Sequence, residues 1–364
     1  MKIGSLLLIM IGPVTILAWA WLLPALARPT LPFAVRVPAE YAKAPVIMKQ
    51  RREYRWWIGL AGGALIAGSV ALSLVVNAGV LSVVTVVVAL VVFFGGFVRA
   101  RHAIRAVKQR EQWYAGLRQG VATDTTLRTE PGRFPWAWAI PALVVLAATV
   151  VTGIVRYPSL PDTLVMHYNA DGVADRVVRT TPATAFVTVI VQAGLTAFLL
   201  LVLGFSFRAR PDLDAAAPVK TARQHRGFRE RMIRALLLVT GCVNVSMFVL
   251  AWQIWDGGRS VSLVAILVPV LVGLVILIWF AVRTGQSGSR LAADEVAEDT
   301  GVVQRDDDKF WHGAGGIYVN RKDPALFLPK RFGIGWTFNF GNPRVLLILA
   351  PLVAIVVLSI VLGR

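Results

Sequence analysis

The stretch AGVLSVVTVVVALVVFFGGFV, residues 78–98, contains no charged side chain. A helix needs about 20 apolar residues to cross the hydrocarbon core of a bilayer. In lipid, only a helix satisfies its own backbone polar groups within a single segment. We therefore predict a transmembrane helix at this stretch.

Seven further apolar runs of similar length extend this prediction to the whole chain. Of the 364 residues, 56% are hydrophobic and 16% are charged, and the mean hydropathy is +0.65, which is too apolar for an ordinary soluble domain. The first run could be a secretory signal, but it is longer than the apolar core of a signal peptide, which favours a membrane anchor. We predict an all-α polytopic membrane protein with about eight transmembrane helices and a small β-rich cytoplasmic module. The other runs are 3–27, 56–76, 136–155, 183–207, 235–254, 261–282 and 345–362.

The net charge of +18 is distributed very unevenly between the two sides of such a bundle. If the loops alternate across eight spans, one side carries 32 of the 38 Lys and Arg residues and the other side carries 6. This asymmetry predicts that the basic side is cytoplasmic and that both termini are extracytoplasmic. The basic residues then set the topology and contact anionic lipid, so we expect no direct nucleic-acid partner. The basic loops are 28–55, 99–135, 208–234 and 283–344.

The predicted spans and loops divide the chain into six parts. We expect polar side chains within the spans to form hydrogen bonds between helices, and the basic stretches 99–118 and 220–234 to extend neighbouring helices and contact lipid. The main polar side chains are Gln192, Asn244 and Gln253. The predicted parts are an N-terminal membrane segment (1–135), a two-helix unit (136–207) with an extracytoplasmic loop (156–182), two further helices (208–282), a linker (283–305), a β-rich module (306–343) and a last helix (344–364).

The loop 156–182 has a turn-rich sequence around one of the four histidines of the chain. Three residues fit calcium-ligand positions, but His167 and Val178 occupy positions at which an EF-hand has carboxylates. Zinc usually needs two or more His or Cys ligands, and the single cysteine, Cys242, lies in a predicted span. We therefore expect no metal and no cofactor. The pattern instead predicts a hairpin, with a strand over 164–168 and a tight turn over 169–172.

The order Leu-Pro, His-Tyr-Asn, Gly and Asp in this loop, followed directly by a span, resembles a domain of unknown function found in the bacterial sporulation-delaying-toxin immunity family. Members protect their own cell from a secreted antimicrobial peptide, and in some systems sequester a cytosolic repressor. The resemblance covers roughly residues 137–207 and implies a signature surface outside the membrane. Its ligand-binding residues would be Pro161, His167, Asn169, Gly172 and Asp175.

The block 306–343 resembles a second uncharacterised module that accompanies the first in bacterial relatives. Its aromatic residues and glycines predict a compact β-rich element, and its segment 326–340 resembles 31–38 in composition, so we expect short extended segments that pack together. The aspartates at 306–308 are expected to form a solvated turn. The predicted contacts to a cytosolic partner are Asp323, Pro324, Pro329, Arg331, Gly333, Gly335, Trp336 and Asn339.

No catalytic motif is present: the chain has no H-E-x-x-H, no nucleophile elbow and no Cys-His arrangement. We expect a sensor or immunity-type protein, not an enzyme, with membrane lipids, a secreted antimicrobial peptide and a cytosolic protein as partners. The alternative is a transport or export component for a peptide or lipid-like substrate, with proline-broken helices along its path. A third hypothesis is a membrane enzyme that uses His167 with an aspartate. A convex lid over the loop would favour sensing, a polar groove between helices transport, and a cavity at His167 an enzyme.

Overall fold

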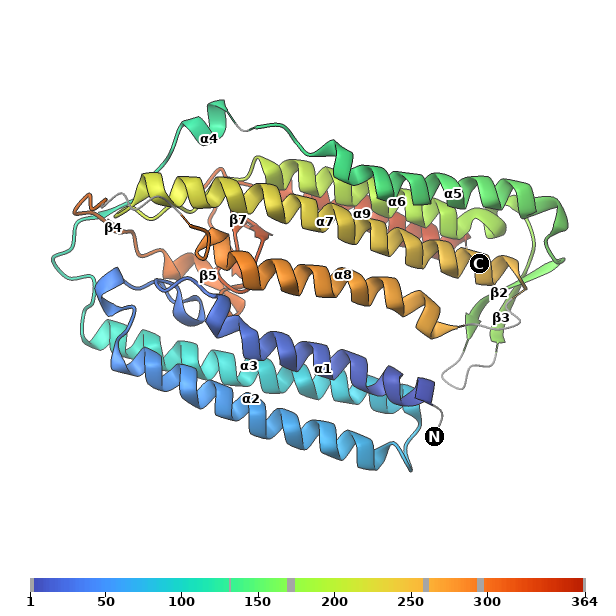
Figure 1. Ribbon diagram of the computed structural model, residues 1–364, viewed down its shortest axis with the longest axis horizontal. Helices are drawn as coiled ribbons and strands as arrows, with labels where there is room; N and C mark the ends of the chain where they lie inside the picture. The colour runs from blue at the N-terminus through green and yellow to red at the C-terminus, as the bar shows by residue number, and fades with distance from the viewer. Residues whose placement is uncertain (1–2, 131, 169–173, 258–261, 293–297, 363–364) are drawn as a thin grey trace. The chain divides into compact units, whose positions relative to one another are not determined.

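The structure is a computed structural model that describes residues 3–130, 132–168, 174–257, 262–292 and 298–362 (Figure 1). Within this described part, eight helices are long and apolar enough to cross a membrane. The predicted fold class, a mostly helical polytopic protein with small β elements, is confirmed. The helices are α1 (Ile3–Leu26), α2 (Pro45–Leu72), α3 (Ala78–Arg110), the short α4 (Thr126–Thr129), α5 (Ile140–Arg156), α6 (Pro182–Phe207), α7 (Pro218–Trp255), α8 (Leu263–Thr284) and α9 (Arg344–Leu362).

The strands are short and form two-stranded sheets. One pair is parallel, β1 (Gln119–Gly120) with β4 (Val303–Gln304). Three pairs are antiparallel: β2 (Thr163–Tyr168) with β3 (Ala174–Arg179), β5 (Trp311–His312) with β6 (Ile317–Tyr318), and β7 (Phe327–Pro329) with β8 (Trp336–Phe338). Short 3-10 helices connect these elements at Pro32–Ala34, Ala39–Tyr41, Trp136–Ala139, Tyr157–Ser159, Gln286–Gly288, Asp308–Phe310 and Gly313–Gly315.

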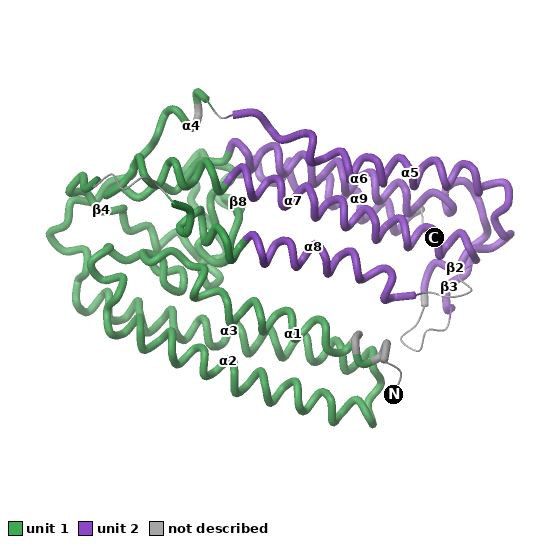
Figure 2. Tube along the Cα trace, viewed as in Figure 1, with its two compact units in different colours: residues 1–131, 209–228, 281–342 green, residues 132–208, 229–280, 343–364 purple. Residues whose placement is uncertain are grey.

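The chain folds into two compact units, each built from several separate segments (Figure 2). Unit 1 contains residues 1–131, 209–228 and 281–342, and therefore includes α1 to α3 and the segment with β4 to β8. Unit 2 contains residues 132–208, 229–280 and 343–364, and includes α5, α6, α9 and the β2–β3 hairpin.

In unit 1, helices α1, α2 and α3 pack against one another around a hydrophobic cluster. Gly12 of α1 allows a close approach, because a Cβ atom there would lie 2.6 Å from the Val86 side chain of α3. Phe33 and Phe332 both pack around Phe97 of α3, so the segments 31–38 and 326–340 share this cluster, as expected from their sequences. The first segment is only partly extended, however: residues 32–34 form a 3-10 turn in which Phe33 has a φ of 47°, and Val35 is extended.

In unit 2, buried polar side chains join three helices. The Asn244 amide of α7 donates to the Ala142 carbonyl of α5 (2.8 Å) and accepts from the Thr196 hydroxyl of α6 (2.9 Å). Gln192 of α6 donates to the Asn244 carbonyl. The predicted hydrogen bonds between helices are confirmed for Gln192 and Asn244. They pair polar groups that would be costly to leave unpaired in lipid.

Candidate functional sites

The β2–β3 hairpin contains the first predicted surface. Helix α6 begins directly after it, with Pro182 in its first turn and Thr181 as the N-cap, whose hydroxyl accepts from the Thr184 amide. Leu164 is fully buried, whereas nearly all of β3 is exposed. The predicted strand over 164–168 is confirmed. The hairpin is thus held at its base and presents β3 to its surroundings.

The side chains of His167 and Asp175 contact each other near the end of this hairpin, and the residue opposite His167 in the strand register is Arg176. The distance from His167 Nδ1 to Asp175 Oδ1 is 2.6 Å, and the two side chains are 64% and 43% exposed. The strand register is irregular on both sides of His167, as at a β-bulge, which re-aims a side chain. Of the other predicted residues here, Pro161 is exposed and its carbonyl accepts from the Thr180 hydroxyl, whereas Asn169 and Gly172, with the predicted turn 169–172, lie outside the described residues.

The second predicted surface surrounds Asp323 in unit 1. The Arg210 guanidinium donates to both carboxylate oxygens of Asp323 (3.0 and 2.9 Å), and the Tyr318 hydroxyl donates to the same carboxylate at 2.9 Å. The Asn339 amide is buried and donates to the carbonyls of Asn320 and Asp323 at 2.9 Å each. Burial raises the pKa of Tyr318 to about 12. These contacts hold the segment 318–339 together.

The other predicted residues of this surface are distributed between its interior and its exterior. Pro329 is buried in β7, and Trp336 in β8 is partly buried. Gly333 and Gly335 have φ angles of 78° and 105° in the connection between these strands, a backbone region that favours glycine. The exposed residue is Pro324. The structure therefore brings the eight residues into one module.

An ionic cluster that the sequence analysis did not predict connects this module with other segments of unit 1. It consists of four cationic and four carboxylate side chains: Arg28, Arg36, Lys108, Arg331, Asp212, Asp306, Asp307 and Asp308. The charges are equal in number, although the chain as a whole has a net charge of +18. All eight residues belong to unit 1.

Asp308 is the most buried carboxylate of the ionic cluster, with an exposed fraction of 6%. It accepts from Lys108 Nζ (2.7 Å), from the Arg36 backbone amide (3.1 Å) and from the Arg331 guanidinium. Burial alone would raise its pKa, but Arg331 and Lys108 hold the pKa of Asp308 down at about 2. The expectation of a solvated turn is therefore wrong for Asp308.

Arg36 is the centre of the other half of the ionic cluster. Its guanidinium contacts Asp212 at 2.9 Å and Asp307 at 2.9 Å. Burial disfavours the charge, but the two carboxylates outweigh it and hold the pKa of Arg36 above its ordinary value. For Asp212 burial again acts against the charge, and Arg36 and Arg28 keep its pKa well below the usual range. The ionic cluster is charged at neutral pH and joins four separate segments of unit 1.

The predicted helical extension is confirmed for 220–234, but for 99–118 it is confirmed only as far as Arg110, where α3 ends. Helix α3 continues to Arg110, and α7 begins at Pro218. Lys108, which was expected to contact lipid, is buried against Asp306 and Asp308 instead. The predicted linker 283–305 contains the buried Gln286, whose amide donates to the carbonyls of Lys330, Arg331 and Gly333. Among the residues that the structure describes, no group of three or more His, Cys, Asp or Glu side chains could hold a metal ion.

Comparisons with known proteins identify both predicted surfaces as domains without an assigned activity. Residues 143–192 match a family described as domain of unknown function (DUF1648), which includes the β2–β3 hairpin. Residues 321–346 match a family of unknown function (DUF5808), which includes all eight residues of the second surface. No curated protein and no solved structure matches the chain. The chain is thus similar to two uncharacterised families in two short regions.

Proposed function

We propose that this chain is a bacterial multi-pass membrane protein of the sensor or immunity type, and that its β2–β3 hairpin binds a secreted antimicrobial peptide or another envelope signal. The observation that carries the proposal is the exposure of the hairpin, because β3 presents five of its six side chains as exposed. A surface that projects in this way suits recognition of a peptide better than catalysis, which needs a concave site.

The backbone of the hairpin supports a specific mode of recognition. In the described residues, β2 and β3 form a sheet of two strands, so no further strand lies beside the outer edge of either one. An extended peptide can add to such an edge as a third strand, and side chains beside the edge then select the sequence. In this mode of recognition the exposed side chains of His167 and Asp175 would contact polar groups of the peptide.

The topology in this proposal follows from the distribution of basic residues. Both termini and the hairpin are extracytoplasmic, and the loops with 32 of the 38 Lys and Arg residues are cytoplasmic. The module around Asp323 is then available to a cytosolic protein through its exposed residues, such as Pro324. The proposed activity is binding on both sides of the membrane, without an enzymatic step and without direct contact to nucleic acid.

A strain that lacks this protein tests the proposal. We would measure its sensitivity to antimicrobial peptides secreted by related bacteria, after complementation with the wild type, with His167→Ala or with His102→Ala at matched membrane levels. His102 is an exposed histidine on α3, so its substitution is the matched control. We expect the wild type and His102→Ala to restore resistance and His167→Ala not to restore it.

Either of two results would remove the support for this function. Equal sensitivity with and without the wild-type protein would exclude immunity, and substrate accumulation in the same strains would then test the transport or export alternative. Full resistance with His167→Ala would show that the hairpin is not the recognition surface.

A further inference from the structure

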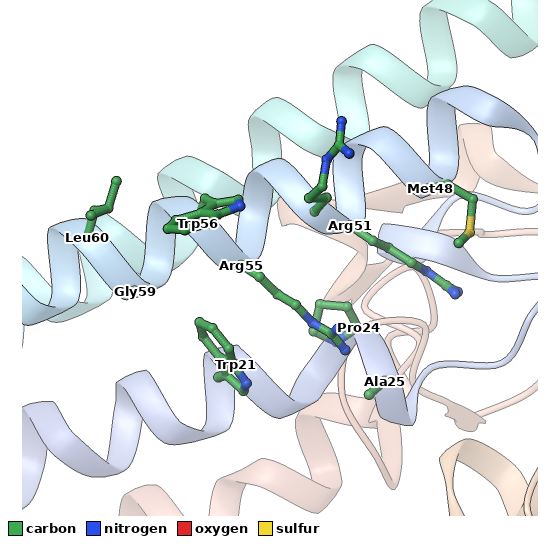
Figure 3. A pocket seen from close by; sticks show the side chains of 10 residues that line it. Trp21, Pro24, Ala25, Met48, Arg51, Arg55, Trp56, Gly59 and Leu60 are labelled. Carbon is green, nitrogen blue, oxygen red and sulfur yellow. The ribbon is translucent and has the colours of Figure 1, made fainter.

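A pocket of about 540 Å³ lies between α1 and α2 within unit 1 (Figure 3). Trp21 of α1 and Arg55 of α2 project into the space between the two helices (Figure 3). The pocket is lined by Trp21, Pro24 and Ala25 of α1 and by Met48, Arg51, Arg52, Arg55, Trp56, Gly59 and Leu60 of α2.

The two ends of this pocket differ in chemistry. Three arginines lie within five consecutive residues of α2, at positions 51, 52 and 55. One turn further along the same helix the lining is apolar, with Trp56, Gly59 and Leu60. The distance along the helix from residue 51 to residue 60 is about 14 Å, at a rise of 1.5 Å per residue. The pocket is therefore cationic at one end and apolar at the other.

Among the residues that the structure describes, no carboxylate neutralises the three arginines. None of them forms an ion pair or a hydrogen bond with a side chain in the described part of the chain, and Nε of Arg51 is buried without a hydrogen-bond partner. The nearest carboxylate in sequence, Glu53, contacts Lys49 and Arg99 instead. Three like charges at this spacing repel one another, so the pocket favours an anion.

The position of the pocket along the helices indicates where this anion would come from. The apolar run of α2 begins at residue 56, so the arginines lie at the end of the span, at the depth of lipid headgroups. Trp21 and Trp56 have the amphipathic rings that are enriched at this interface. A ligand that fits has a phosphate at the arginines and a hydrocarbon chain beside Gly59 and Leu60.

We infer that the pocket between α1 and α2 binds one anionic membrane phospholipid. The phosphate lies at the cationic end, which Arg51, Arg52 and Arg55 line, and an acyl chain runs along the apolar end past Trp21. Gly59 leaves room for this chain, because a Cβ atom there would already lie 3.4 Å from the Trp21 ring. This inference concerns unit 1 and does not depend on the function proposed for the hairpin.

Native mass spectrometry of the purified full chain tests the inference. Phosphatidylglycerol and phosphatidylcholine with identical acyl chains would be added in series, and the apparent Kd of the first bound lipid measured. A basic residue near a membrane surface corresponds to about a fivefold change in affinity. We expect phosphatidylglycerol to bind about fivefold more weakly to Arg55→Gln and about a hundredfold more weakly to the triple Arg51→Gln, Arg52→Gln, Arg55→Gln variant.

Matched variants distinguish lipid binding in this pocket from nonspecific attraction of anionic lipid to a basic protein. Gly59→Leu fills the apolar end, whereas Gly63→Leu adds the same side chain to α2 where nothing lies within 4 Å of the new Cβ atom. Arg231→Gln removes an equal charge from an exposed position of α7. We expect Gly59→Leu to weaken phosphatidylglycerol binding at least tenfold, and the two controls to leave it unchanged.

Four outcomes would overturn the inference. These are equal binding of the two lipids by the wild type, unchanged binding by Arg55→Gln, equal weakening by Gly59→Leu and Gly63→Leu, and displacement of phosphatidylglycerol by glycerol phosphate at similar concentration. The last outcome would show that the site binds a soluble phosphate and that the acyl chain does not contribute to binding. Arg55 is exposed, so Arg55→Gln is a test that does not depend on folding of the triple variant.

Discussion

Replacement of Asp308 by asparagine should destabilise unit 1 by about 3 kcal/mol. The substitution keeps the volume of the side chain but removes the charge that faces Lys108 and Arg331. Removing one partner of a buried ion pair typically costs about 3–5 kcal/mol, because the remaining charges stay buried. We expect the lower end of this range, since Asp306 still contacts Lys108 and Asp307 still contacts Arg331.

The same substitution should change how stability depends on pH. The pKa of Asp308 is about 2 in the folded chain, compared with an ordinary value of 3.8. Because the folded-state pKa is depressed, the carboxylate stabilises the fold above pH 4, and this contribution is lost as the pH falls from about 4 to 2. The difference between the two pKa values corresponds to about 2 kcal/mol at neutral pH, a component that Asp308→Asn lacks.

Denaturant unfolding of the full chain in detergent, at pH 7 and at pH 2.5, measures both effects. The matched control is Asp306→Asn, because Asp306 is more exposed and, among the described residues, forms an ion pair with Lys108 alone. We expect the control to lose less than about 1 kcal/mol. The difference between the wild type and Asp308→Asn should shrink by about half between pH 7 and pH 2.5. An equal cost for both variants at pH 7, or a difference that does not change with pH, would refute this account of the ionic cluster.

Two further predictions concern the packing of each unit, and thermal unfolding in detergent measures both. Gly288→Ala should lower the free energy of unfolding by more than about 3 kcal/mol, since its Cβ atom would lie 2.4 Å from the Gln224 carbonyl oxygen. Gly301→Ala, also at positive φ but in open space, should cost only about 1 kcal/mol, and equal costs would contradict the steric argument. Asn244→Leu should cost about 1–2 kcal/mol because the Ala142 carbonyl loses its donor, and an unchanged melting temperature would contradict the role of this bond.

The eight spans could be predicted from the sequence because hydropathy is a local property. Helices α2, α3 and α7 extend well beyond their apolar runs at one end, however. Helix α2 begins at Pro45 and not near residue 56, whereas the extensions of α3 and α7 were expected from their basic stretches. Helical hydrogen bonds continue through charged residues as readily as through apolar ones, so hydropathy indicates the buried length in lipid and not the ends of the helix.

The ionic cluster could not be predicted, because its partners are far apart in the chain. Arg36 is 176 residues from Asp212 and 271 residues from Asp307. Three consecutive aspartates are typical of a solvated turn, and the net charge of +18 conceals a local balance of four positive and four negative side chains. The sequence did contain one indication. Residues 306–308 are the one acidic run of the module, and the chain has many basic residues for which no partner within the chain was expected.

The shortness of the strands explains why unit 1 needs this ionic cluster. Strands β5 to β8 contain two or three residues each, so few ladder hydrogen bonds hold the segment 306–343. The apolar cluster around Trp311 is also small. Interactions between distant segments must then hold the module in place. Buried ion pairs do so at fixed geometry, because a buried charge that loses its partner is costly. Since buried pairs are screened much less by salt than exposed ones, the module should respond strongly to acid and weakly to ionic strength.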